Sequence, residues 1–113
     1  MVEYTVSLDS VFGALADPTR RDILRRVSSR QLTISQLAEH YNLSFAAVSK
    51  HLMVLEKAKL IIKHRVGRKQ YVRAQGPALQ EANDYLEQFR QVWQDRLDAL
   101  EIYLNESDEP NDR

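Results

Sequence analysis

The spacing of apolar residues along the chain predicts a series of short helices in its first half. Residues 8–15 place apolar side chains on one side of a helix, and Asp17-Pro18 then marks a stop and a new start. Asp at an N-cap accepts a bond from free backbone amides, and Pro at the first helical position loses no needed donor. A second helix is therefore predicted from Pro18.

The next two predicted helices are short and lie close together. Thr33-x-x-Gln36 has the spacing of a capping box, which predicts a helix that ends near Asn42. Ser44 is suited to cap a further helix almost immediately afterwards. Two short helices joined by so tight a turn have the layout of a helix-turn-helix.

The helix predicted over residues 45–58 has one apolar face and a bare amino end. At ~100° per residue, Val48, Leu52 and Leu55 fall within one narrow arc, which predicts a stripe that faces the core. A purely structural helix usually covers its outer face with long charged residues, but Ala46 and Ala47 leave the start of this one uncovered. This end of the helix is therefore shaped for close approach to another molecule.

A hairpin follows. Residues 60–66 and 70–74 are rich in branched and aromatic side chains, and they flank the stretch Val66-Gly67-Arg68-Lys69. Such residues favour strands, and Gly67 supplies the turn between them. We therefore predict a mainly α fold with a small β-hairpin whose tip is basic.

The last part of the chain predicts one long helix. Apolar positions recur every three or four residues from position 77 to about position 104. A helix of this length extends about 40 Å at ~1.5 Å per residue, more than the small preceding core is expected to cover. We therefore expect it to pack on a symmetry mate as well. Residues 105–113 contain no apolar side chain and predict a disordered acidic tail.

Length and composition limit the possible classes of protein. A chain of 113 residues with 43% hydrophobic content predicts one domain, residues 1–104, with a modest core. Cysteine is absent, which excludes disulfides and thiolate metal sites. The sequence has neither a membrane-length apolar run nor the layout of a signal peptide, so we expect a cytoplasmic protein without a membrane partner.

The net charge of zero is an average over two unlike halves. Residues 1–76 carry 13 Lys and Arg against 6 Asp and Glu, whereas residues 77–113 carry 3 against 10. Seven basic residues and no acidic one lie between Lys57 and Arg73. Placed on and after a helix-turn-helix, such a cluster favours a nucleic-acid partner over a merely solvated surface.

Specific motifs then point to a family. The stretches ALADPTRRDILRRV, ISQLAEHYNLS, AVSKHLMVLEKAKLI and VGRKQYVR, in this order and spacing, resemble the ArsR/SmtB family of winged helix-turn-helix repressors. The resemblance covers residues 11–104. It implies a homodimer built by the first and last helices, in which each protomer offers one recognition helix and one wing to double-stranded DNA. It also implies an inverted-repeat operator.

The resemblance places the candidate DNA contacts on two elements. The recognition helix would lie in the major groove, where small residues admit the backbone and thymine methyls can be touched. The wing would approach the neighbouring minor groove and supply affinity through phosphate contacts. The predicted DNA-binding residues are Arg20, Ser44, Phe45, Ala46, Ala47, Ser49, Lys50, His51, Arg65, Arg68 and Lys69.

Three of these assignments stay open. Lys50 contacts either a base or a phosphate. His51 lies near the edge of the core face, so a structural histidine bonded to a neighbouring carbonyl is about as well supported as a DNA contact. Arg20 and Arg21 either contact phosphate or lie on a solvated helix face.

The predicted dimer interface uses the first and last helices. Its residues are Val11, Phe12, Leu86, Phe89, Trp93, Leu97 and Leu100. The aromatic residues Tyr85, Phe89, Trp93 and Tyr103 either pack this interface or line a small pocket for an organic effector, and packing is the better supported of the two. A small-molecule or protein effector therefore stays open.

Several functions are disfavoured. Many family members sense metals, but Thr33 and Ser35 stand where thiolates would be, and the last helix has no His. We therefore predict neither a metal nor another cofactor. No catalytic constellation or phosphate loop stands out, so we do not expect an enzyme. The remaining alternative is a winged helix used as a protein-docking module, although such a module has no need of the basic cluster.

Overall fold

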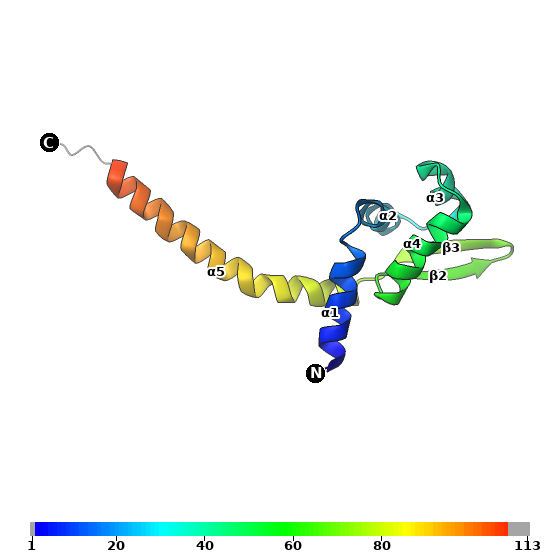
Figure 1. Cartoon of the computed structure of the whole chain (residues 1–113), viewed down its shortest axis with the longest axis horizontal. Helices are drawn as coiled ribbons and strands as arrows, with labels where there is room; N and C mark the ends of the chain where they lie inside the picture. Colours follow the sequence, from blue (N-terminus) through cyan, green and yellow to red (C-terminus); the bar gives the residue numbers. More distant parts are fainter. Residues whose placement is uncertain (1, 109–113) are drawn as a thin grey trace. The chain divides into compact units, whose positions relative to one another are not determined.

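The computed structural model describes residues 2–108, in the order α1 (Val2–Ala14), α2 (Pro18–Ser29), β1 (Leu32–Thr33), α3 (Ile34–Tyr41), α4 (Phe45–Lys57), β2 (Ile61–Val66), β3 (Lys69–Ala74) and α5 (Pro77–Asp108) (Figure 1). It divides into two compact units, of which the first ends at Ala82 and the second begins at Asn83. The first unit contains the helix-turn-helix and the sheet. The second consists of the greater part of α5.

The predicted helix starts are confirmed. The carboxylate of Asp17 accepts a hydrogen bond from the amide of Arg20 at 3.0 Å, so Asp17 caps α2. At α3, the Gln36 amide donates to the Thr33 hydroxyl at 3.0 Å, and the Thr33 amide donates to the Gln36 side chain at 2.8 Å. These bonds form a reciprocal capping box. Because α3 is only eight residues long, its carboxyl end comes shortly before the start of α4.

Two predicted boundaries are corrected. The first helix begins at Val2 rather than near position 8. The last helix continues to Asp108, so residues 105–108 are helical although the tail was predicted to be disordered from residue 105. Polar residues extend a helix readily once its preceding turns are formed, because each added residue gains one backbone bond. The rest of the predicted tail, residues 109–113, lies outside the described residues.

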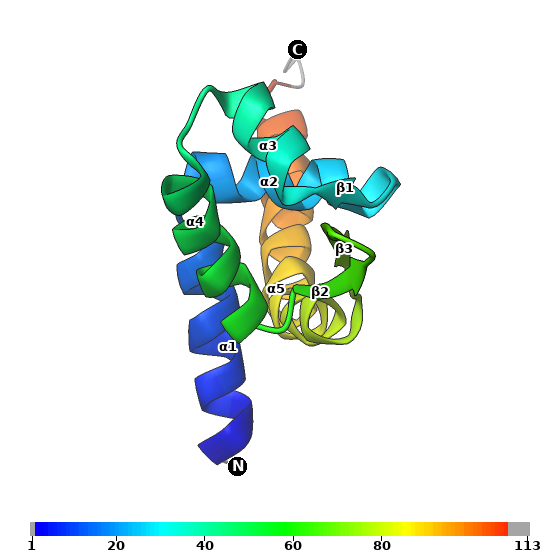
Figure 2. The same cartoon turned by 90° about the vertical axis from the view of Figure 1, so that its right-hand side faces the viewer.

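The predicted hairpin belongs to a three-stranded antiparallel sheet. The strand order is β1-β3-β2, with Val66 opposite Lys69 at the tip and Leu32 opposite Val72 at the other edge. Gly67, the first residue of the turn, has φ +62°, whereas Arg68, the second, does not have a positive φ. This combination is that of a type II′ hairpin turn. Figure 2 shows β1 next to β3. We call β2, the turn and β3 the wing.

The core of the first unit lies between the helices and the wing. The predicted stripe of α4 is confirmed, since Val48, Leu52 and Leu55 are fully buried. The apolar residues that join them are Val11, Ala14, Ile23, Leu24, Val27, Ile34, Leu37, Ala58, Leu60, Ile61, Val72, Ala78 and Ala82. One prediction is wrong here: Val11 was assigned to the dimer interface, but it is 0% exposed within the protomer and has no surface left for a partner.

A polar cluster ties α2 to α3. The carboxylate of Asp22 accepts hydrogen bonds from the Tyr41 hydroxyl at 2.5 Å, from Arg26 at 3.0 Å and from Arg25. These bonds, the one from Tyr41 foremost, hold the pKa of Asp22 well below its usual value. Burial and the same bond raise the pKa of Tyr41 to about 12. The cluster therefore stays ionised at Asp22 and neutral at Tyr41 at physiological pH.

Both helices of the helix-turn-helix end on a left-handed residue. After α3, Asn42 has φ 55°, and after α4, Lys59 has φ 62°. At the second end the Leu60 amide bonds to the Leu55 carbonyl at 3.0 Å and the Lys59 amide to the Glu56 carbonyl at 2.9 Å, the pattern of a Schellman turn. Asn tolerates this conformation, whereas Lys at the second turn carries the strain of a Cβ in the left-handed region.

Candidate nucleic-acid interface

The amino end of α4 is exposed and contains two small residues, Ala46 and Ala47. Ser44 caps the helix by accepting a bond from the Ala47 amide at 3.1 Å, which leaves its hydroxyl proton free to donate. Phe45 is 58% exposed, and Ala46 beside it is also exposed. Ala46 and Ala47 carry only a methyl group each, so beside Phe45 the backbone at this end can come close to a ligand.

The predicted polar contacts follow one turn later. Ser49 is half-buried and Lys50 is exposed. The side chain of His51 is 24% exposed, and its Nδ1 lies 3.9 Å from the carboxylate of Asp17. That distance exceeds a hydrogen bond, and no bond from His51 to a carbonyl is found among the side chains that the structure describes. The choice between a structural role and a DNA contact stays open.

This pairing also affects the α2 cap. The pKa of Asp17 is lowered, first by the bond from the Arg20 amide and then by the nearby His51 imidazole. Asp17 therefore remains a carboxylate, the form that suits an N-cap. His51 thus places a side chain of α4 beside the carboxylate at the start of α2.

The wing presents its basic residues in a different setting. Arg65, Arg68 and Lys69 are all exposed, and among the described side chains of residues 8–106 none of them has an ion-pair partner. Lys63, on β2 and farther from the turn than Arg65, forms an ion pair with Glu56 at 3.1 Å. The cationic groups at the wing tip are thus available to an anion, whereas the one nearer the helices is neutralised internally.

Arg20 and Arg21 donate hydrogen bonds within the protomer. Arg20 donates from Nε to the Ala14 carbonyl at 2.7 Å and from Nη2 to the Gly13 carbonyl at 3.1 Å. Arg21 donates to the Leu15 carbonyl at 2.8 Å. Both guanidinium groups therefore bond to carbonyls at and just beyond the end of α1, where positive charge also complements the helix dipole. A phosphate contact by Arg20 stays a prediction that relies on its remaining N–H groups.

Comparison with known proteins decides the family. Residues 17–63 match the family described as "Bacterial regulatory protein, arsR family". The transcriptional repressor SdpR of Bacillus subtilis (strain 168) is 35% identical over 82 residues, which make up 73% of this chain and 91% of SdpR. The chain belongs to the ArsR family.

Solved structures agree with this assignment. An ArsR-like transcriptional regulator from Rhodococcus sp. RHA1 is 34% identical, with a TM-score of 0.69, over 88% of this chain and 93% of that one. The homodimeric winged helix-turn-helix domain Mb0332 from Mycobacterium bovis is 20% identical, with a TM-score of 0.63, over 87% of this chain and 88% of that domain, a likeness of fold alone. The predicted winged helix-turn-helix fold is confirmed.

Among the described side chains, those of residues 8–106, no three His, Asp or Glu groups come together as a metal site requires. Thr33, at a position predicted to replace a thiolate, instead uses its hydroxyl in the α3 cap. Over the same described range, no helix is long and apolar enough to cross a membrane.

The structure also brings together residues that the sequence did not single out. Ser35, Gln36, Gln70 and Tyr71 line a surface pocket together with Phe45 of α4 and the three basic residues of the wing tip. The capping-box motif marked residues 33–36 as a helix start only. Nothing in the local pattern indicated that this start lies opposite the wing, because that proximity arises from the pairing of β1 with β3.

Proposed function

We propose that the chain is a homodimeric transcriptional repressor of the bacterial cytoplasm that binds double-stranded DNA at an inverted-repeat operator. One observation carries the proposal. Phe45, the first residue of α4, and the basic residues Arg65, Arg68 and Lys69 of the wing line a single pocket. The recognition helix and the wing tip therefore share one face, as contact with one duplex requires.

The two elements would divide the work. Ala46 and Ala47 let the amino end of α4 enter the major groove, where Ser49 and Lys50 reach base edges or adjacent phosphates. Arg65, Arg68 and Lys69 supply contacts that depend on charge and weaken as salt rises. Sequence discrimination would thus rest on α4, and most of the affinity on the wing.

The second unit supplies the dimer. Leu86, Phe89, Trp93, Leu97 and Leu100 recur on one side of α5, and each is about half exposed or more in the single protomer. A stripe of this size on one helix has no core of its own to join, and a second copy buries it by self-complementary packing. Phe12, 37% exposed on α1, is the remaining candidate from the first helix.

The symmetry of the dimer sets the form of the operator. Two recognition helices related by a two-fold axis read two half-sites of opposite orientation, whose centres lie about 34–36 Å apart when they occupy one face of the duplex. The 35% identical relative SdpR is named a transcriptional repressor, which supports repression as the outcome. A repressor of this kind acts by occupying a site within a promoter.

Selection from a random duplex library at near-physiological salt tests the proposal without a guess about the target. We expect enrichment of a two-fold symmetric site, and a steep loss of affinity as salt is raised. Recovery of no sequence, together with binding that salt does not weaken, would overturn the proposal. That result would favour the protein-docking module, whose affinity for its partner survives salt.

A further inference from the structure

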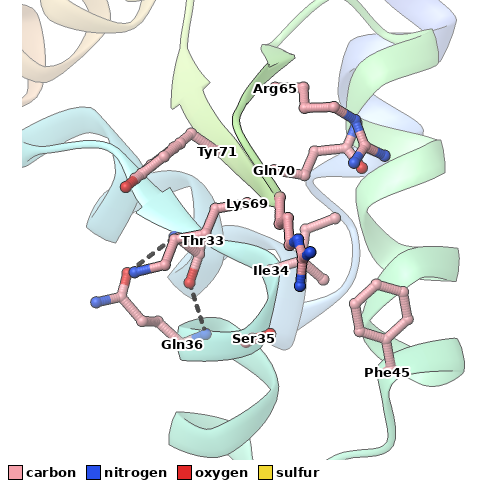
Figure 3. A pocket seen from close by; sticks show the side chains of 10 residues that line it. Thr33, Ile34, Ser35, Gln36, Phe45, Arg65, Lys69, Gln70 and Tyr71 are labelled. Atoms are coloured by element: carbon pink, nitrogen blue, oxygen red, sulfur yellow. Dashed lines mark hydrogen bonds between the residues drawn. The ribbon is translucent and has the colours of Figure 1, made fainter.

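The pocket between α3 and the wing has a volume of about 400 Å³ and opens to the surface (Figure 3). Three segments far apart in the sequence form it: the start of α3, the start of α4 and the tip of the wing. Its lining residues are Thr33, Ile34, Ser35, Gln36, Phe45, Arg65, Arg68, Lys69, Gln70 and Tyr71.

The lining is positively charged without compensation. Arg65, Arg68 and Lys69 contribute three cations, and no Asp or Glu is among the lining residues. None of the three forms an ion pair or a side-chain hydrogen bond with any residue whose side chain the structure describes, residues 8–106. Three unpaired cations around one hollow produce a positive potential that favours an anion.

Uncharged donors face the same hollow. In α3 the capping box pairs the amides of Thr33 and Gln36 with each other's side chains. The amide of Ser35 lies between them in the first turn, where a helix provides no backbone acceptor, and its side chain is exposed. Ser35 therefore offers a hydroxyl and an amide to whatever the cations attract.

We propose that this pocket binds a phosphate group of the DNA backbone, with Ser35 as a donor opposite the wing cations. The inference rests on the proposed function and adds to it a contact from α3, outside the recognition helix and the wing. Phosphate suits the lining because its oxygens accept several hydrogen bonds at once while its charge is met by Arg and Lys. The wing tip then contacts a phosphate in this pocket as well as the minor groove.

The position of the pocket favours DNA over a free anion. Six lining residues, including Ser35 and Arg68, are exposed, so a strand can lie across the opening, whereas a small anion would remain largely hydrated. Phe45 forms one wall and is also the first residue of the recognition helix. A phosphate beside the groove that α4 enters is therefore within reach of the pocket.

The substitution Ser35→Asp tests the pocket. An acid in the first turn suits a helix, so the melting temperature is expected to hold or rise, while its charge repels a phosphate. We expect the affinity for the enriched duplex to fall about tenfold or more, because charged hydrogen bonds of this kind each contribute roughly that factor. Gln91→Glu is the matched control, since it adds the same charge on α5, and it should leave affinity within about twofold.

A second measurement identifies the phosphate. Neutral methylphosphonate linkages are placed one at a time along the duplex, and the loss of affinity is compared between the wild type and Ser35→Asp. We expect at least one position per half-site where neutralisation weakens the wild type but not the variant. Equal losses at every position, or equal affinity of the two proteins, would overturn the pocket as a backbone site while leaving the repressor intact.

Free phosphate is the other source of the same chemistry. Inorganic phosphate alone is titrated into the full chain, with chemical shifts of the Ser35 amide as the readout. We expect no saturable shift below about 10 mM, because a surface pocket holds a lone hydrated anion weakly. Saturable binding well below that concentration, lost in Ser35→Asp, would replace the DNA phosphate by a free anion. Failure of the wild type to bind any duplex would instead refute the proposed function.

Discussion

The two units of the chain use apolar side chains in opposite ways. In residues 8–82 many aliphatic residues join one buried core, as Ile23, Leu52 and Ile61 do, and the sequence of this unit carries an excess of positive charge. In residues 83–106 the large apolar residues remain exposed, up to 64% for Tyr103 and 61% for Trp93, and the charge is negative. The first unit therefore leaves charge on its surface, and the second leaves an apolar face uncovered.

The difference separates two kinds of binding. The first unit has a complete core, so its free surface can be devoted to charge, which recognises a polyanion at long range. The second unit gains little from folding alone, because a single helix in water is marginal without packing. It therefore requires an apolar partner, and its negative charge does not favour a polyanion. The predictions below break one side of this contrast at a time.

The largest effect is expected from Leu97→Asp on α5. A carboxylate in the middle of the apolar stripe must be desolvated on dimerisation, so we expect the dimer dissociation constant to rise at least about 100-fold. Sedimentation equilibrium measures it directly. Gln91→Asp, on the opposite side of α5 at ~100° per residue, should leave the dimer intact. Two variants with the same oligomeric state would show that the stripe is not the interface.

The next effect concerns the first unit. Replacing Arg68 and Lys69 together by Ala should weaken binding to every duplex by about tenfold or more, and lower the slope of log K against log[salt] by about 2. Lys57→Ala with Lys59→Ala removes the same charge from the other end of α4, and we expect a much smaller change of slope. An unchanged slope in the wing variant would remove the wing from DNA binding.

A smaller effect should follow from Asp22→Asn. The folded-state pKa of Asp22 lies below its usual value of 3.8, so the carboxylate stabilises the fold above pH ~4, and the stabilisation is lost as pH falls through the folded-state pKa. We expect the variant to lose about 1–2 kcal/mol at pH 7, and the difference from the wild type to shrink below pH ~4.

Urea unfolding at a series of pH values measures this, with the exposed substitution Glu39→Gln as a control that should show neither change. Tyr41→Phe should reproduce part of the loss at pH 7, because it removes only the bond from the hydroxyl. A stability difference between wild type and Asp22→Asn that is independent of pH would contradict the role of the charge.

The smallest effect should come from the two left-handed helix ends. Lys59→Gly should raise the free energy of unfolding by about 1 kcal/mol, because Gly adopts φ 62° without the Cβ clash of Lys. Asn42→Gly should change it by no more than a few tenths of that, since Asn already tolerates the conformation. A lower melting temperature for Lys59→Gly would show that the lysine stem contributes packing that outweighs the strain.

Local chemistry accounts for what the sequence predicted well. Asp17-Pro18, Thr33 with Gln36, and Ser44 mark helix starts because a cap is satisfied within three residues, and all three caps are present. The buried stripe of α4 and the turn at Gly67 are equally local. Such features need no knowledge of the rest of the fold.

Features that depend on distant residues were not predicted. β1 is two residues long and exists only through its pairing with β3. Val11 reads as an interface residue on its own helix, but the protomer core covers it. Arg20 reads as a surface cation until its carbonyl acceptors at the end of α1 are seen. The pocket at Ser35 likewise forms only when the starts of α3 and α4 meet the wing tip, which explains its absence from the predicted site.

The number of chains on the enriched duplex tests the central claim most directly. Mass photometry or sedimentation of the complex, with wild type and Leu97→Asp in parallel, counts them. We predict two wild-type chains on each symmetric site. We also predict a large loss of affinity in Leu97→Asp, which a higher protein concentration partly recovers. One wild-type chain per site, or full affinity of a monomeric Leu97→Asp, would contradict an operator read by a dimer.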